Sequence, residues 1–66
     1  MRWHTPRFEN NMCVIEGISC EECGAEINIL LNGSIELYEI SYGGIPKFDS
    51  YHTDISVAIK TAEGWT

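Results

Sequence analysis

The pentapeptide Cys20-Glu21-Glu22-Cys23-Gly24, here called the CxxC turn, gives the clearest structural signal in the sequence. Two thiols separated by two residues can converge from one tight turn on a single tetrahedral metal ion. The glycine directly after the second thiol lets the chain leave the turn with a positive φ angle. The spacing therefore predicts half of a structural zinc site, formed by Cys20 and Cys23.

The short length of the chain suggests that such a site would be needed to stabilise the fold. With 66 residues, the sequence predicts a single domain over 1–66, close to the lower size limit for a self-supporting core. Ordering the chain costs roughly 1.5 kcal/mol per residue, which is close to what burial of its apolar surface returns. Zinc binding contributes on the order of 10–16 kcal/mol in small peptides. We therefore expect a structural Zn²⁺ as cofactor.

A closed tetrahedral site needs two more ligands, and three side chains are candidates. His52 is expected near the CxxC turn because it follows the third predicted strand after one short loop. A hairpin at the start of the chain would bring His4 there as well and leave Cys13 roughly 16 Å away. A turn at Glu16-Gly17 would instead bring Cys13 to the site. The predicted ligands are Cys20, Cys23, His52 and His4, with Cys13 as the replacement for His4.

The sequence around the CxxC turn predicts an antiparallel sheet. The β-branched stretch 12–18 and the alternating stretch 25–31 are predicted strands on either side of the turn. Asn32-Gly33 then favours a tight hairpin to a strand over 34–42, because both residue types accept positive φ. This hairpin is the strongest structural prediction outside the CxxC turn.

Weaker signals predict further strands at the edges of this sheet. Asn10-Asn11 favours a hairpin between 3–9 and 12–18, with Pro6 facing outward on an edge strand. Residues 47–51 are expected to form a loop or a short edge strand. Together these signals predict a small sheet of three to four strands.

The apolar spacing becomes helical near the end of the chain. Apolar residues from Ile55 to Ala62 follow i, i+3, i+4, i+7 spacing, with Thr53 or Asp54 as the N-cap and Gly64 as the stop. Trp65 is expected to pack back on the core. The predicted fold is therefore α+β: a small antiparallel sheet of three to four strands, covered on one face by a single C-terminal helix and stapled by zinc.

Charge and cysteine count limit the function classes. Ten acidic against four basic residues give a formal charge of −6, which argues against direct binding of nucleic acid and favours a basic protein surface as partner. The polar start predicts no secretory leader, and no segment approaches the roughly 20 apolar residues of a membrane span. Together with an odd number of cysteines, these features predict a reducing, cytoplasmic location without a disulfide framework.

No pattern in the sequence favours an enzyme. A redox dithiol would need a helix starting at the motif to lower its thiol pKa, but the following residues alternate as in a strand. Glu21 and Glu22 between the thiols would raise that pKa. Catalysis at an open zinc site needs a nearby general base, and nothing marks one of the glutamates as buried.

Ile15–Cys23 resembles the metal-binding loop of heavy-metal-associated domains, the copper and mercury chaperone modules. Residues 55–65 resemble the second helix of that family. The resemblance implies a βαββαβ fold and a carrier function in which Cys20 and Cys23 bind copper(I) or a similar soft metal. Departures include Ile18, where the family has methionine, and the hairpin signal where its first helix would lie.

A second resemblance is one of kind. A very short, acidic chain with a small sheet and a terminal helix ending in Ala62-Glu63-Gly64-Trp65 is similar to phage-encoded inhibitors of the anti-CRISPR type. The resemblance implies a non-enzymatic protein that binds a host nuclease in the host cytosol and blocks its access to nucleic acid. Charge and aromatic character supply the candidate contacts, since no residue of that class carries over. The predicted partner-binding residues are Glu21, Glu22, Glu36, Glu39, Asp49 and Asp54, with Tyr38, Tyr42 and Tyr51 as aromatic anchors.

Overall fold

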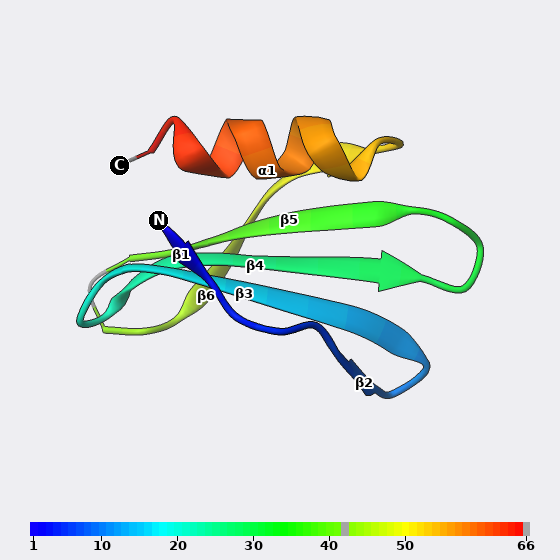
Figure 1. The fold of residues 1–66 in the computed structure, drawn as a ribbon, viewed down its shortest axis with the longest axis horizontal. Helices are drawn as coiled ribbons and strands as arrows, with labels where there is room; N and C mark the ends of the chain where they lie inside the picture. The colour runs from blue at the N-terminus through cyan, green and yellow to red at the C-terminus, as the bar shows by residue number, and fades with distance from the viewer. Residues whose placement is uncertain (42, 66) are drawn as a thin grey trace.

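The computed structural model describes residues 1–41 and 43–65 as one antiparallel sheet with a helix across one face (Figure 1). The described part contains six strands, so the prediction of three to four was wrong. Two short N-terminal segments pair with the sheet, and residues 47–51, expected as a loop or a short edge strand, belong to an edge strand. The elements are β1 (Arg2–Trp3), β2 (Arg7–Glu9), β3 (Met12–Cys20), β4 (Cys23–Leu30), β5 (Ile35–Ile40), β6 (Pro46–His52) and α1 (Ile55–Glu63).

The strands lie in the order β1-β3-β4-β5-β6. Strand β2 also pairs with β3, at residues 12–14, whereas β1 pairs with residues 17 and 18 of the same strand. The β4–β5 hairpin predicted from Asn32-Gly33 is confirmed. Gly33 has a φ of 90°, and the amide of Ser34 donates to Asn32 Oδ1 at 2.9 Å. Residue 42, the end of the predicted third strand, lies outside the described residues.

The N-terminal hairpin is also confirmed. Asn10 and Asn11 have φ values of 50° and 61°, the left-handed conformation that tight hairpin turns require. The pairing with β3 shifts by one residue between β2 and β1, and Pro6 lies in that interval, exposed. Proline has no amide hydrogen, so an unpaired position at the edge of the sheet suits it.

The helix follows its sequence pattern. Asp54 is the N-cap and Gly64 the C-cap, as predicted. Ala58 and Ala62 are fully buried in the same core as Ile27 and other central sheet residues. Trp65 is half-buried against this core, which confirms its predicted anchoring role.

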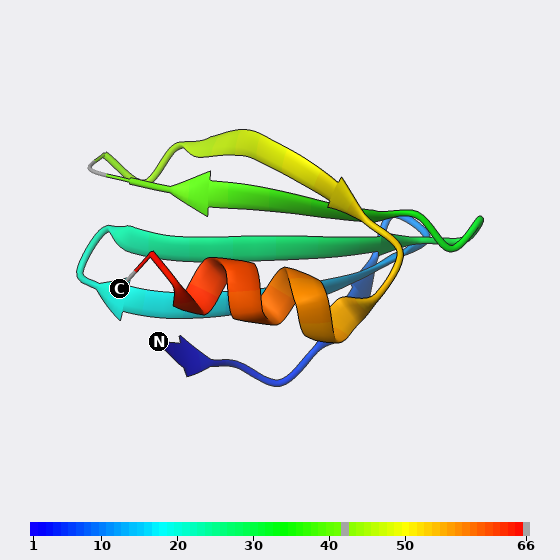
Figure 2. The same cartoon turned by 90° about the horizontal axis from the view of Figure 1, so that it is seen from above.

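The sheet has one covered face and one open face (Figure 2). The covered face carries Ile27 and Leu37 beneath α1. Since successive side chains of a strand alternate between faces, their neighbours point away from the helix. This second surface, called the open face below, has no helix over it. Its main residues are Arg7, Glu9, Met12, Val14, Glu16, Glu26, Asn28, Leu30, Glu36, Tyr38, Phe48 and Tyr51.

Candidate functional site

The CxxC turn is the tip of the β3–β4 hairpin. Cys20 and Cys23 are direct cross-strand partners, with Cα atoms 4.8 Å apart, and their sulfurs form a disulfide. Ser19 is the extra residue of a register shift just before the turn. The sequence predicted no disulfide framework, and this single local bond forms because a two-residue turn places the two thiols directly opposite each other.

The predicted zinc ligands do not meet. His52 pairs with Ile35, which in turn pairs with Ile29 of β4. Ile29 lies five residues along the strand from Gly24, so His52 is roughly 17 Å from the CxxC turn. The order of β5 and β6 carries it to the opposite end of the sheet. Cys13 is half-buried opposite Ile29.

His4 lies beside Glu16 on the β1 side, where its amide donates to the Glu16 carbonyl at 2.8 Å. Within 1–41 and 43–65, no three histidine, cysteine, aspartate or glutamate side chains form a group that could hold a metal ion. The side chains predicted as ligands do not fit a zinc ion. The prediction of a zinc-stapled fold was therefore wrong. In the described residues a disulfide joins the two ends of the CxxC turn, and the sheet has more strands than predicted.

Gly24 has a different role from the predicted one. Positive φ angles among the described glycines occur at positions 33, 43 and 44, not at 24. A Cβ atom at position 24 would instead overlap the carbonyl oxygen of Gly17 on β3. Glycine is needed here because the two backbones approach closely beside the register shift.

The six predicted partner-binding carboxylates lie in several separate places. Glu21 and Glu22 are exposed at the CxxC turn, where Glu22 accepts from the amide of Gly43 at 3.2 Å. Glu39 lies opposite Lys47. Asp49 lies in the irregular part of β6, and Asp54 caps α1. Of the six, Glu36 belongs to the open face.

The open face carries a row of carboxylates, Glu16, Glu26 and Glu36, of which Glu36 was among the predicted partner-binding residues. Glu16 on β3 is the direct partner of Glu26 on β4. The guanidinium of Arg7 pairs with Glu16 and, at 3.2 Å, with Glu9. These bonds, first to Glu9 and then to Glu16, raise the pKa of Arg7. The signal was present in the sequence, since Glu16 and Glu26 occupy the positions that alternate with core residues of their strands.

Asn28 lies in the middle of the same face. It is only 5% exposed, and its Oδ1 has no hydrogen-bond partner. Its cross-strand neighbours are Val14 and Glu36. A buried oxygen without a donor has lost its hydration without compensation, which makes this position costly for stability.

An aromatic cluster borders the carboxylates. Tyr38 and Phe48 meet edge to face with ring centroids 5.6 Å apart, and Phe48 and Tyr51 lie 4.7 Å apart. The Tyr38 hydroxyl donates to Glu36 Oε1 at 3.3 Å. Burial, and then the negative charge of Glu36, raises the pKa of Tyr38 above its ordinary value. Tyr38 and Tyr51 thus share a cluster, while Tyr42 lies outside the described residues.

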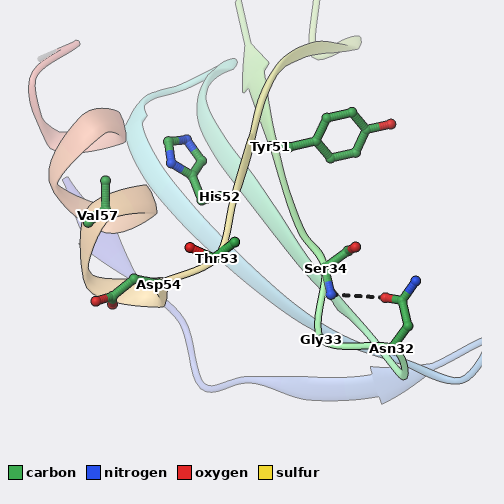
Figure 3. Close-up of a pocket in the computed structure, with 8 residues that line it drawn as sticks. All are labelled: Asn32, Gly33, Ser34, Tyr51, His52, Thr53, Asp54 and Val57. Atoms are coloured by element: carbon green, nitrogen blue, oxygen red, sulfur yellow. Dashed lines mark hydrogen bonds between the residues drawn. The ribbon is translucent and has the colours of Figure 1, made fainter.

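A groove of about 530 Å³ lies between the β4–β5 turn and the start of α1 (Figure 3). His52 points toward the helix side of its strand and Tyr51 to the other side. Two side-chain oxygens of the groove are engaged within the protein: Asn32 Oδ1 accepts from the Ser34 amide, and Asp54 Oδ1 accepts from the Ser56 amide and hydroxyl.

Ser50 and His52 form a short hydrogen bond beside this groove, with 2.7 Å between Oγ and Nε2. The Ser50 hydroxyl donates its single proton to Asp49 Oδ2 at 2.8 Å. His52 therefore donates to Ser50 in this arrangement, which is the reverse of the direction in which a general base would activate a serine. The pair serves to fix His52 against its own strand.

The single helix of the described residues has nine residues, too few to cross a membrane. In comparisons with family models, curated proteins and solved structures, the chain matches none of them. What the chain does must therefore be inferred from its own surface.

Proposed function

We propose that this chain is a small, non-enzymatic protein-binding module that inhibits a nucleic-acid-handling enzyme, as the anti-CRISPR type of inhibitor does. In this proposal its open face docks on the basic surface where the enzyme holds nucleic acid, in the cytosol of the cell that contains the enzyme. The supporting observation is the carboxylate row of Glu16, Glu26 and Glu36 on three adjacent strands.

The arrangement of this row supports a role in binding. Directly opposed like charges destabilise a sheet, and Glu16 and Glu26 are directly opposed. Diagonal neighbours such as Glu26 and Glu36 lie about 7–8 Å apart. Close carboxylates on an uncovered face attract a basic surface at long range and suppress contact with acidic ones. The net charge of −6 adds to this attraction.

The aromatic cluster supports a specific interface over a purely electrostatic one. Tyrosine and phenylalanine provide rigid contact area, and tyrosine is enriched among the residues that dominate binding energy. Phe48 is 44% exposed and Tyr51 is 68% exposed. Both border the carboxylate row, so one partner surface can cover charge and rings together.

The test is inhibition of a panel of purified nucleases with basic grooves, including RNA-guided nucleases. We expect the chain to inhibit at least one, with excess nucleic acid relieving inhibition and rising salt weakening it. The double variant Glu26→Gln/Glu36→Gln should lose inhibition, whereas Glu39→Gln, outside the open face, should retain it. Inhibition retained by the double variant, or no inhibition across the panel, would contradict the proposal.

The alternative, carriage of copper or a similar soft metal by Cys20 and Cys23, requires the reduced dithiol because both sulfurs are bonded to each other here. Copper(I) titration of the reduced chain tests it. Tight binding by the wild type and its loss in Cys23→Ser would support the carrier.

A further inference from the structure

The unpaired oxygen of Asn28 lies among other hydrogen-bond acceptors. Its cross-strand neighbour Glu36 carries a carboxylate, and Glu26 lies two residues before it on the same face of β4. The nearby donor is the Tyr38 hydroxyl, which is directed to Glu36. The centre of the open face therefore combines two carboxylates and a buried amide oxygen. Within residues 1–41 and 43–65, the Tyr38 hydroxyl is the one donor hydrogen-bonded to any of these three side chains.

The opposite half of the same face shows how such acceptors are satisfied. There, the guanidinium of Arg7 bridges Glu9 and Glu16 through separate nitrogens. Among the described residues, three other basic side chains remain. Arg2 lies opposite Ile18 at the β1 edge of the same face, and Lys47 and Lys60 lie on β6 and α1. None of the three is hydrogen-bonded or ion-paired with Glu26, Asn28 or Glu36 in this part of the chain. The open face thus has two clusters of hydrogen-bond acceptors. In the first, Glu9 and Glu16 accept from the protein's own Arg7, and the second lies around Asn28.

We propose that Glu26, Asn28 and Glu36 form a binding site for an arginine side chain of the partner protein. This inference rests on the proposed function and names the group on the partner that the open face recognises. A guanidinium offers five N–H donors in a planar fork, enough to serve two carboxylates and, once the Asn28 side chain turns outward, its amide oxygen.

Arginine fits this site better than lysine. Its planar group stacks on aromatic rings and is more weakly hydrated than an ammonium, so it loses less on entering a half-buried site. The ring of Tyr38, two residues from Glu36, provides an aromatic surface at the border of the site. Lysine offers three donors from a single point and cannot bridge separate carboxylates in the same way.

The experiment is an NMR titration of the isotopically labelled full chain with the capped tripeptide Gly-Arg-Gly and, separately, Gly-Lys-Gly, at low ionic strength. The readouts are the Asn28 side-chain amide and the Tyr38 ring. We expect saturable shifts at both groups and about tenfold tighter binding of the arginine peptide, as one additional charge-assisted hydrogen bond would give. Equal affinity for the two peptides, or shifts produced by calcium chloride in place of the arginine peptide, would overturn the inference.

Three variants locate the binding energy. Asn28→Leu removes the amide oxygen and keeps the branched outline of the side chain, and Glu36→Gln removes one charge. Each should weaken arginine binding about tenfold. Glu39→Gln removes a carboxylate outside the site and should bind like the wild type. Circular dichroism confirms folding of each variant, and binding unchanged in a folded Asn28→Leu would overturn the role of Asn28.

Failure of this inference is distinguishable from failure of the proposed function. If the chain inhibits a nuclease through Glu26 and Glu36 but shows no preference for arginine, the arginine site is wrong and the inhibitor proposal stands. If the arginine peptide binds as expected and no nuclease is inhibited, the site stands and the inhibitor proposal is wrong.

Discussion

Glu16 and Glu26 face each other directly across β3 and β4, on the side of the sheet that the helix leaves uncovered. Arg7 partly offsets this repulsion by pairing with Glu16. Nothing comparable is positioned at Glu26 among the described residues. The open face therefore contains an unfavourable contact between two negative charges, and a positive charge placed beside Glu26 by a partner would reduce the repulsion.

Replacing Glu26 by glutamine is expected to stabilise the free protein. Removal of one of two opposed like charges should raise the free energy of unfolding by about 0.2–1 kcal/mol at low salt. The gain should shrink at high salt, where the repulsion is screened. Urea denaturation at two salt concentrations measures both effects.

Glu39→Gln is the matched control for this variant. Glu39 lies opposite Lys47, so the same chemical change removes an attraction instead of a repulsion. Its free energy of unfolding should stay equal or fall slightly. A destabilised Glu26→Gln protein would show that the carboxylate stabilises the face in a way that the pairing does not reveal.

The disulfide, and not a metal ion, is expected to stabilise the CxxC turn. The double variant Cys20→Ser/Cys23→Ser should lower the free energy of unfolding by about 2 kcal/mol, the chain-entropy value for so short a loop. Reduction of the wild type should have the same effect. Excess chelator should leave the melting temperature unchanged.

Cys13→Ser separates the disulfide from general loss of sulfur, because Cys13 is a free, half-buried residue far from the turn. Reduction should lower the free energy of unfolding of the Cys13→Ser variant by the same amount as that of the wild type. A melting temperature that falls on chelation would restore a metal as the stabilising group.

Local signals in the sequence predicted the elements whose formation depends on a few adjacent residues. The turns at Asn10-Asn11 and Asn32-Gly33 and the helix capped by Asp54 all form where expected. Each depends on backbone preferences or side-chain hydrogen bonds within four or five residues. Such preferences can be read directly from the sequence.

Features that depend on non-local pairing were not predicted. His52 was expected beside the CxxC turn, but the course of β5 and β6 carries it to the other end of the sheet. The burial of Asn28 was not predicted either, because its neighbours Val14 and Glu36 come from two other strands. Glu16 and Glu26 were not predicted beside Glu36 for the same reason, since the carboxylate row forms only when β3, β4 and β5 are in register.

Gly24→Ala is expected to be strongly destabilising. An added Cβ would overlap the Gly17 carbonyl oxygen, and that backbone atom cannot move without disturbing β3. We expect a loss of about 2–3 kcal/mol, in the upper range for overpacking. Gly64→Ala is the control: position 64 has a φ of −69°, and the nearest atom to an added Cβ is Thr61 O at 3.3 Å. That variant should lie within about 0.5 kcal/mol of the wild type, and a Gly24→Ala protein of equal stability would show that the hairpin tip adjusts freely.

Asp54 is expected to make the stability of the protein depend on acidic pH. Hydrogen bonds from the Ser56 hydroxyl and then from its amide lower the pKa of Asp54 in the folded state. Because the folded pKa lies below the unfolded one, this contribution is complete above the ordinary aspartate pKa of about 4 and is lost as the pH falls through the lowered value. Asp54→Asn keeps a capping oxygen but cannot titrate, so its melting temperature should fall less steeply with acid than that of the wild type. Asp54→Ala should melt lower already at neutral pH, because the N-cap is lost. Asp49→Asn, which removes a carboxylate away from the helix, is the control and should show the wild-type dependence of melting temperature on pH. If Asp54→Asn also shows the wild-type dependence, the linkage to Asp54 is refuted.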